Sequence, residues 1–134
     1  MPKVFLADLP VSYDQAVAGA LDYIGFQGRL RPGLRVAIKP NLTFPEYRPG
    51  VMTNPEAVRA LVARLSEAGC RVTICEADSG GYNRFSMNEV FRVTGLADVA
   101  AEYGARLVNL SYQPSRRIEV NCGFRRLKVP LPRL

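Results

Sequence analysis

Two short groups of polar residues stand out because each comes directly after a β-forming run of the sequence. The first is Lys39-Pro40-Asn41, and the second extends from Glu76 to Gly81. A lysine ammonium can neutralise a phosphate or a carboxylate, or act as a base when its pKa is lowered. The pair Gly80 and Gly81 lets backbone N–H groups turn toward an anion. Together these residues predict a site for an anionic small molecule, either a phosphate or a carboxylate.

Lys39 is the residue best suited to contact such an anion. The chain has 15 arginines and only three lysines, so arginine is its usual cation and the choice of lysine here is informative. The alternative is a strand-end lysine that points into solvent, and the sequence does not decide between the two. Asn41 is also typical of a turn that follows a proline.

Other chemistries are limited by composition. Glu76 and Asp78 could hold a hard cation such as Mg²⁺, but no metal ligand motif is present and we expect no cofactor in this chain. The absence of histidine excludes Ser-His-Asp and Cys-His catalysis. Cys70, Cys75 and Cys122 are too widely spaced for a disulfide framework or a cluster motif. Neither a dinucleotide fingerprint nor a Walker loop occurs.

A helix predicted over Thr53 to Ala68 connects the two polar groups. Thr53 or Asn54 is a suitable cap and Pro55 a suitable first residue, and capping is sufficient to explain Thr53 and Asn54. In a βαβ crossover, however, the helix begins at the edge where the preceding strand ends, and ligands bind at that edge in open α/β sheets. We therefore expect the following ligand-binding residues to lie together: Lys39, Asn41, Thr53, Asn54, Asp78, Ser79, Gly80 and Gly81.

The wider pattern predicts a single α/β domain over residues 1–134. Strands are expected over Val4–Ala7, Arg35–Lys39, Arg71–Glu76 and Arg106–Leu110, with helices between them that begin after Ser12, at Thr53, after Ser86 and at Leu96. This βαβαβαβ order is typical of a mainly parallel sheet with flanking helices. The spacing of apolar residues then changes to every second position, which predicts a final antiparallel hairpin that turns at Asn121-Cys122-Gly123.

The net charge of +6 arises mostly in that hairpin. Six basic residues and one acid lie in residues 115–134, which is compatible with a nucleic-acid interface or with the solvated face of a hairpin. We favour the second, because no aromatic residues interleave for base stacking. No apolar stretch approaches the roughly 18 residues that span a bilayer, and the amino terminus has no signal-peptide pattern. We expect a cytoplasmic protein without a membrane partner, and a nucleic-acid partner is the less favoured alternative.

Four segments in this order resemble the amino-terminal half of the domain of unknown function 362 family: Ile38 to Asn41, Thr53 to Val58, Leu65 to Gly69, and Asp78 to Gly80. The resemblance implies a family without an established activity, some of whose members carry 4Fe–4S clusters in a separate ferredoxin-like domain. Relatives also continue beyond a point like Val129 to Pro132, so the resemblance implies a truncated version of a longer domain.

Three functions remain open on the sequence. The chain is an enzyme or binding domain for an anionic ligand, a non-catalytic module that docks to a redox or iron-sulfur partner, or a nucleic-acid binder that uses the basic hairpin. We also expect a homo-oligomer, because Ile118, Val120, Leu127 and Val129 would form an apolar hairpin face without a covering layer.

Overall fold

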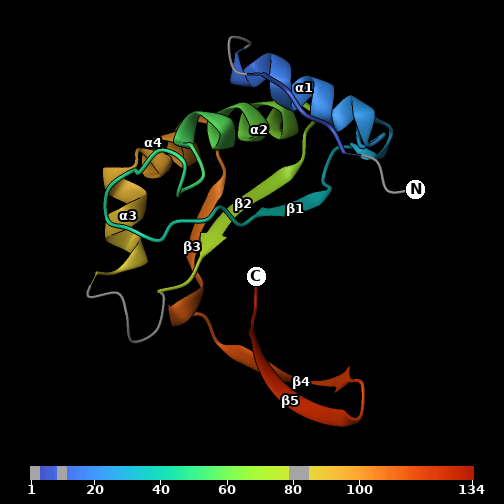
Figure 1. Ribbon diagram of the computed structural model, residues 1–134, viewed down its shortest axis with the longest axis vertical. Coiled ribbons are helices and arrows are strands. Elements are labelled where there is room, and N and C mark those ends of the chain that lie inside the picture. Colours follow the sequence, from blue (N-terminus) through green and yellow to red (C-terminus); the bar gives the residue numbers. More distant parts are fainter. Residues whose placement is uncertain (1–3, 9–11, 79–84) are drawn as a thin grey trace.

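Three parallel strands form the central sheet of the computed structural model, which describes residues 4–8, 12–78 and 85–134. β1 (Arg35–Ile38), β2 (Arg71–Glu76) and β3 (Arg106–Asn109) lie in the order β1-β2-β3 (Figure 1). Ile38 lies opposite Ile74, and Glu76 lies opposite Asn109. The carboxyl ends of the three strands therefore meet at one edge, as the predicted crossovers require.

Four α-helices and two short 3₁₀ helices connect or precede these strands: α1 (Tyr13–Tyr23), η1 (Gln27–Arg29), α2 (Pro55–Glu67), α3 (Met87–Val93), α4 (Leu96–Glu102) and η2 (Leu110–Tyr112). The predicted caps are confirmed, since the side chains of Ser12, Asn54 and Ser86 each accept a backbone N–H in the first turn of α1, α2 and α3. Gly69 follows the end of α2 with a φ of +73°, a left-handed conformation that suits glycine.

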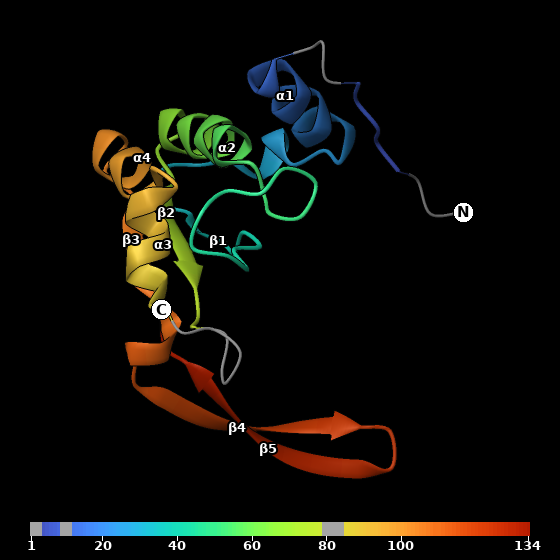
Figure 2. The same ribbon diagram turned by 60° about the vertical axis from the view of Figure 1, so that its left-hand side comes forward.

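The hydrophobic core lies between one face of the sheet and the helices α2, α3 and α4 (Figure 2). Val72 and Ile74 of β2 are buried there against Val62, Phe91 and Leu96, one residue from each helix. Successive strand residues point to opposite faces, so only alternate positions contribute to this core. α1 packs on α2 rather than on the sheet.

The predicted carboxyl-terminal hairpin is confirmed, with a shifted turn. β4 (Ser115–Cys122) and β5 (Arg125–Pro132) form a separate antiparallel two-stranded sheet that projects from the helices and the parallel sheet (Figures 1 and 2). The turn consists of Gly123 and Phe124 instead of residues 121–123. Gly123 has a φ of +61°, and a two-residue hairpin turn needs a positive φ at its first position.

The prediction of a first strand over Val4–Ala7 is wrong, and so is the strict βαβαβαβ order. Residues 4–8 have no regular structure, and the parallel sheet contains three strands rather than four. Val4 and Leu6 are largely exposed, while the Phe5 ring lies 5.7 Å from that of Tyr23 on α1. The segment contacts a helix, so its apolar residues do not indicate a sheet position.

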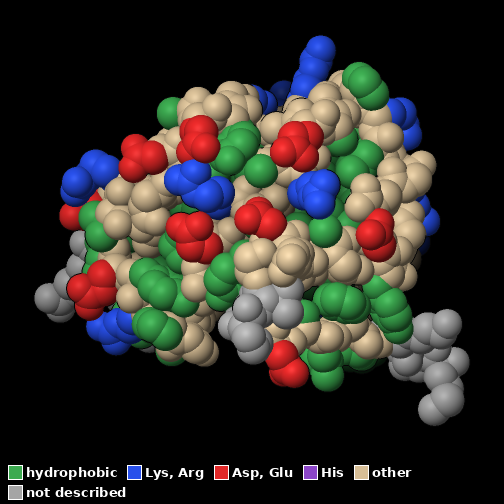
Figure 3. Space-filling model, turned by 90° about the horizontal axis from the view of Figure 1, so that it is seen from above, with side chains coloured by type: hydrophobic (Ala, Val, Ile, Leu, Met, Phe, Trp, Pro, Cys, Tyr) green, Lys and Arg blue, Asp and Glu red, His purple; other side chains and the backbone are tan. Residues whose placement is uncertain are grey.

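The helices carry mixed charge. Figure 3 views the molecule from the top of Figure 1. On this face acidic and basic side chains are interspersed, and neither sign forms a large patch. None of the described helices is long and apolar enough to cross a membrane.

Candidate functional site at the carboxyl edge of the sheet

An ion pair joins the ends of β1 and β2. Nζ of Lys39, the residue after β1, donates to Oε2 of Glu76, the last residue of β2, at 2.7 Å. The Lys39 side chain is 62% exposed, whereas that of Glu76 is only 11% exposed. The second oxygen of Glu76, Oε1, accepts the backbone N–H of Ala77 at 2.8 Å. Glu76 is therefore held from both sides, and it holds the lysine ammonium at the solvent boundary.

Asn41 organises the loop between β1 and α2. Its backbone N–H donates to Oγ1 of Thr53 at 2.8 Å, and its carbonyl accepts the N–H of Thr53 at 3.0 Å. Its side-chain amide donates to the carbonyl of Val51, and its Oδ1 accepts the hydroxyl of Thr43. These contacts bring the two ends of the loop together. The side chain of Asn41 is thus engaged by the loop, which gives it a structural role beside any contact with a ligand.

Asn54 lies next to this loop closure and caps α2. Its Oδ1 accepts the N–H of Glu56 at 2.9 Å. This is the plain capping interaction that the sequence already explained.

Asp78 connects three elements. Its Oδ1 accepts the N–H of Met87 at the start of α3 at 2.6 Å and the side-chain amide of Asn109 at the end of β3 at 2.9 Å. Its own N–H donates to Oγ of Ser111 at 2.9 Å, and the N–H of Ser111 donates to Oδ1 of Asn109. Asp78 thus serves as a junction of the sheet edge with α3. Ser79, Gly80 and Gly81, which were also predicted, lie outside the described residues.

The sequence analysis missed three polar residues of this edge: Thr43, Asn109 and Ser111. Asn109 is 6% exposed and comes directly after the β-forming run 106–108. It therefore carries the same signal that identified Lys39 and Glu76, a polar residue at the carboxyl end of a strand. Applied to β3 as well, this rule would have found it.

Three of the predicted ligand-binding residues, Lys39, Asn41 and Asp78, line a shallow hollow of about 260 Å³, which we call the carboxyl-edge hollow. It is lined by Lys39, Asn41, Leu42, Thr43, Glu76, Ala77 and Asp78. Thr53 is joined to it through its hydrogen bonds with Asn41, and Asn54 follows Thr53 in the chain. Among the described residues that line it, Lys39 is the one cation, and Glu76 and Asp78 are the carboxylates. Both carboxylates accept hydrogen bonds from the protein, so their charge is already partly compensated.

A buried thiol precedes Glu76 in β2. Cys75 is 3% exposed, and burial raises the pKa of its thiol, with a further rise from the Glu76 carboxylate that Lys39 partly opposes. A thiol kept in its neutral form is a poor nucleophile and a poor metal ligand. Within the described residues there is also no group of three or more Cys, Asp or Glu side chains arranged to hold a metal ion.

These features define an α/β domain with a parallel sheet, helices on one face and polar side chains at its carboxyl edge. Residues 36–134 match a family model described as Domain of unknown function (DUF362). The chain belongs to this family, which confirms the resemblance found in the sequence. No curated protein and no solved structure matches the chain.

Proposed function

We propose that the chain binds a small molecule through a phosphate or carboxylate group at the carboxyl-edge hollow. Lys39 supplies the positive charge. The observation that supports this most is the unequal exposure of its ion pair, because Glu76 is nearly buried while the lysine side chain is mostly exposed. An ammonium has three N–H donors, and the bond to Glu76 uses one of them. Among the described residues no other acceptor contacts this ammonium, so its other donors can serve a ligand that approaches from solvent.

The partner of Lys39 also favours binding over catalysis. A general base must be able to take up a proton, whereas Lys39 is the cationic member of an ion pair at 2.7 Å. In this role it provides a fixed positive charge. The polar groups of Asn41 and Thr43 on the same wall add hydrogen-bonding capacity that can orient the bound group.

A titration of phosphorylated and carboxylated metabolites against the wild-type protein and Lys39→Met tests this function. The variant keeps the aliphatic stem and removes the ammonium, so ligand binding measured by calorimetry is expected to be lost. Lys128→Met is the matched control, because Lys128 is an exposed lysine on β5, outside the hollow. If both variants bind the ligand as the wild type does, Lys39 is not the anion contact.

A loss of binding in Lys39→Met has two possible causes, because the variant removes the ammonium and also leaves Glu76 without its ion-pair partner. The double variant Lys39→Met/Glu76→Gln removes both charges and serves as the second probe. If it is as stable as the wild type and still binds no ligand, the loss is due to the missing ammonium. If it binds normally, the single variant acted through Glu76 and the proposal fails.

The uncovered hairpin supports a second candidate function, docking to another protein. Cross-strand pairing places Ile118 with Val129 and Val120 with Leu127 on one face of β4 and β5, and Leu127 is 46% exposed. A two-stranded sheet is marginally stable alone. We propose that a second copy of the chain covers this apolar face. Two identical copies can bury the same face against each other in a symmetric dimer.

A further inference from the structure

A second positively charged surface lies at the other end of the sheet. Each of the three parallel strands begins with an arginine: Arg35 in β1, Arg71 in β2 and Arg106 in β3. In each case a glycine with a positive φ stands two residues earlier, at Gly33, Gly69 and Gly104. The pattern Gly-x-Arg therefore occurs at every entry into the sheet.

The strand register places the three arginines on the same face. Arg35 lies opposite Arg71, and Arg106 lies opposite Thr73, two residues further along β2. Residues two apart on a strand point to the same side. We call the surface formed by Arg35, Arg71, Thr73 and Arg106 the arginine face.

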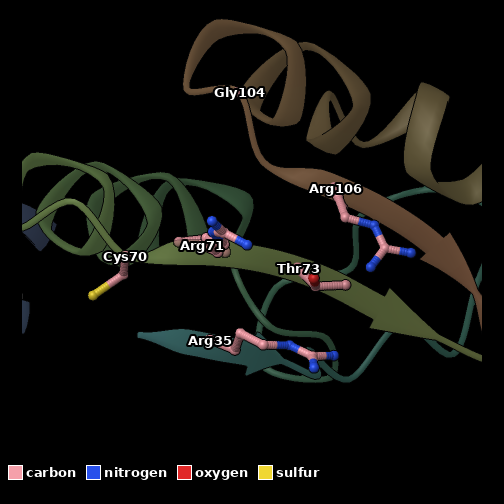
Figure 4. A pocket seen from close by; sticks show the side chains of 7 residues that line it. Arg35, Cys70, Arg71, Thr73, Gly104 and Arg106 are labelled. Carbon is pink, nitrogen blue, oxygen red and sulfur yellow. The ribbon is translucent and has the colours of Figure 1, made fainter. Parts of the chain in front are cut away.

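The arginine face is open to solvent. The three arginines and Ala37 are exposed, in contrast to Val72 and Ile74, which point to the helix-covered face and are buried. Parallel sheets are normally covered on both faces. The open face includes a hollow of about 480 Å³ that is lined by Arg35, Cys70, Arg71, Val72, Thr73, Gly104 and Arg106 (Figure 4).

No acidic side chain balances this charge. The lining contains no Asp or Glu, and the ion pairs among the described residues use Lys39, Arg48 and Arg59 as their cations. All 12 acidic residues of the chain lie within the described ranges. Like charges on neighbouring strands are unfavourable, so an anion that bridges them would relieve their repulsion.

An oxygen acceptor already contacts one of the three guanidinium groups. Nη2 of Arg35 donates to a main-chain oxygen of Leu134 at 2.8 Å. Arg35, Ala37, Thr73 and Leu134 also line an adjoining hollow of about 360 Å³. The guanidinium of Arg35 is therefore directed so that an oxygen on the open side of the sheet can reach it.

We propose that the arginine face binds an oligophosphate, with the three guanidinium groups as its contacts. Guanidinium groups match phosphate oxygens through paired hydrogen bonds. Neighbouring strands are roughly 4.8 Å apart, so three strands spread the charge over about 10 Å. A diphosphate or triphosphate offers more oxygens over this distance than a single phosphate does, so it can contact more of these groups at once. The site is distinct from the carboxyl-edge hollow, because Lys39 lies at the opposite end of β1.

Calorimetry with inorganic triphosphate tests the proposal at about 0.15 M salt, where contacts between distant surface charges are screened. Wild-type protein should bind triphosphate more tightly than orthophosphate or sulfate at equal ionic strength. Arg71→Gln and Arg106→Gln should each weaken binding by about tenfold, the loss expected for one charged hydrogen-bonding group. Arg117→Gln, which removes an exposed arginine from β4, should leave the affinity unchanged.

Further variants separate this site from general charge effects and from the proposed function. Arg71→Lys and Arg106→Lys keep the charge and should recover only part of the affinity, because an ammonium lacks the paired geometry. The losses caused by Arg71→Gln and Arg106→Gln should be the same in the wild-type and the Lys39→Met background, because Lys39 lies at the opposite end of β1. Amide chemical shifts of the wild-type protein should change at Ala37 and Thr73 when triphosphate is added, a measurement that does not depend on any variant.

Three results would overturn the proposal. One is an equal loss of affinity in Arg117→Gln, which would indicate attraction to net charge alone. Another is unchanged affinity in both Arg71→Gln and Arg106→Gln. The third is binding of nucleoside triphosphate or duplex DNA with no binding of inorganic triphosphate, which would assign the arginine face to recognition of a nucleoside or of nucleic acid.

Discussion

Lys39 and Glu76 form an ion pair of 2.7 Å across the ends of two neighbouring parallel strands. The two residues lie 37 positions apart in the chain, and the βαβ crossover brings them together. The nearly buried glutamate thereby positions the lysine ammonium at the solvent boundary of the sheet edge.

Removal of Lys39 alone should destabilise the fold more than removal of both charges. In Lys39→Met the nearly buried Glu76 carboxylate keeps, among the described residues, only the Ala77 N–H as a partner, and we expect a loss of about 1–2 kcal/mol in the free energy of unfolding. In Lys39→Met/Glu76→Gln no unpaired charge remains, so most of this loss should be recovered. Urea denaturation of the wild type, both single variants and the double variant measures the coupling. An equal loss of unfolding free energy in Lys39→Met and in the double variant would contradict this coupling between Lys39 and Glu76.

Asp78→Ala should destabilise the junction between β2, β3 and α3. The change leaves the Met87 N–H and the amide of the buried Asn109 without their acceptor, and an unsatisfied buried donor costs about 1–3 kcal/mol. Thermal or urea unfolding would measure the loss. Glu67→Gln, an exposed change at the end of α2, is the control and should alter stability by no more than about 0.5 kcal/mol. Matching effects in the two variants would show that Asp78 is not structural.

The three cysteines should differ in their reactivity. Cys122 is exposed, whereas Cys75 is buried and its pKa is raised. Alkylation with iodoacetamide, followed by mass spectrometry, should therefore modify Cys122 first and Cys75 only after unfolding, since the thiolate is the reactive form. Rapid labelling of Cys75 in folded protein would contradict its burial.

The raised pKa of Cys75 also predicts a pH dependence of stability. The folded state holds the thiol proton more tightly than the unfolded state, so its contribution is fully present below the ordinary thiol pKa of 9.0 and is lost as pH rises through the higher folded value. As the pH is raised through 9.0 and above, the free energy of unfolding should fall more steeply for the wild type than for Cys75→Ala. Parallel curves for the two proteins would exclude this contribution.

A charge on the apolar face of the hairpin should prevent self-association. Val120→Lys places an ammonium on the face shared with Ile118 and Leu127, whereas Asn121→Lys adds the same charge to the opposite face and is the matched control. Light scattering over a range of concentrations should show an oligomer for the wild type and Asn121→Lys and a monomer for Val120→Lys. A wild type that stays monomeric at high concentration, with protected hairpin amides, would contradict the proposed contact.

Much of the fold followed from local signals. The α2 helix was predicted within two residues at each end, because Asn54, Pro55 and Gly69 act on the backbone beside them. The hairpin was predicted from alternation, but its turn moved to Gly123 and Phe124 because cross-strand pairing decides the register. The strand predicted over Val4–Ala7 failed because a short apolar run fits a helix surface as well as a sheet.

The sequence by itself determined which residues stand at the carboxyl ends of the strands, since polar residues after β-forming runs can be recognised locally. Only the tertiary structure decided what they contact. It paired Lys39 with Glu76, engaged Asp78 with Asn109, and placed Arg35, Arg71 and Arg106 on one open face. These relationships depend on strand order, register and the choice of covered face. Contacts between distant segments settle all three, and no short stretch of sequence contains them.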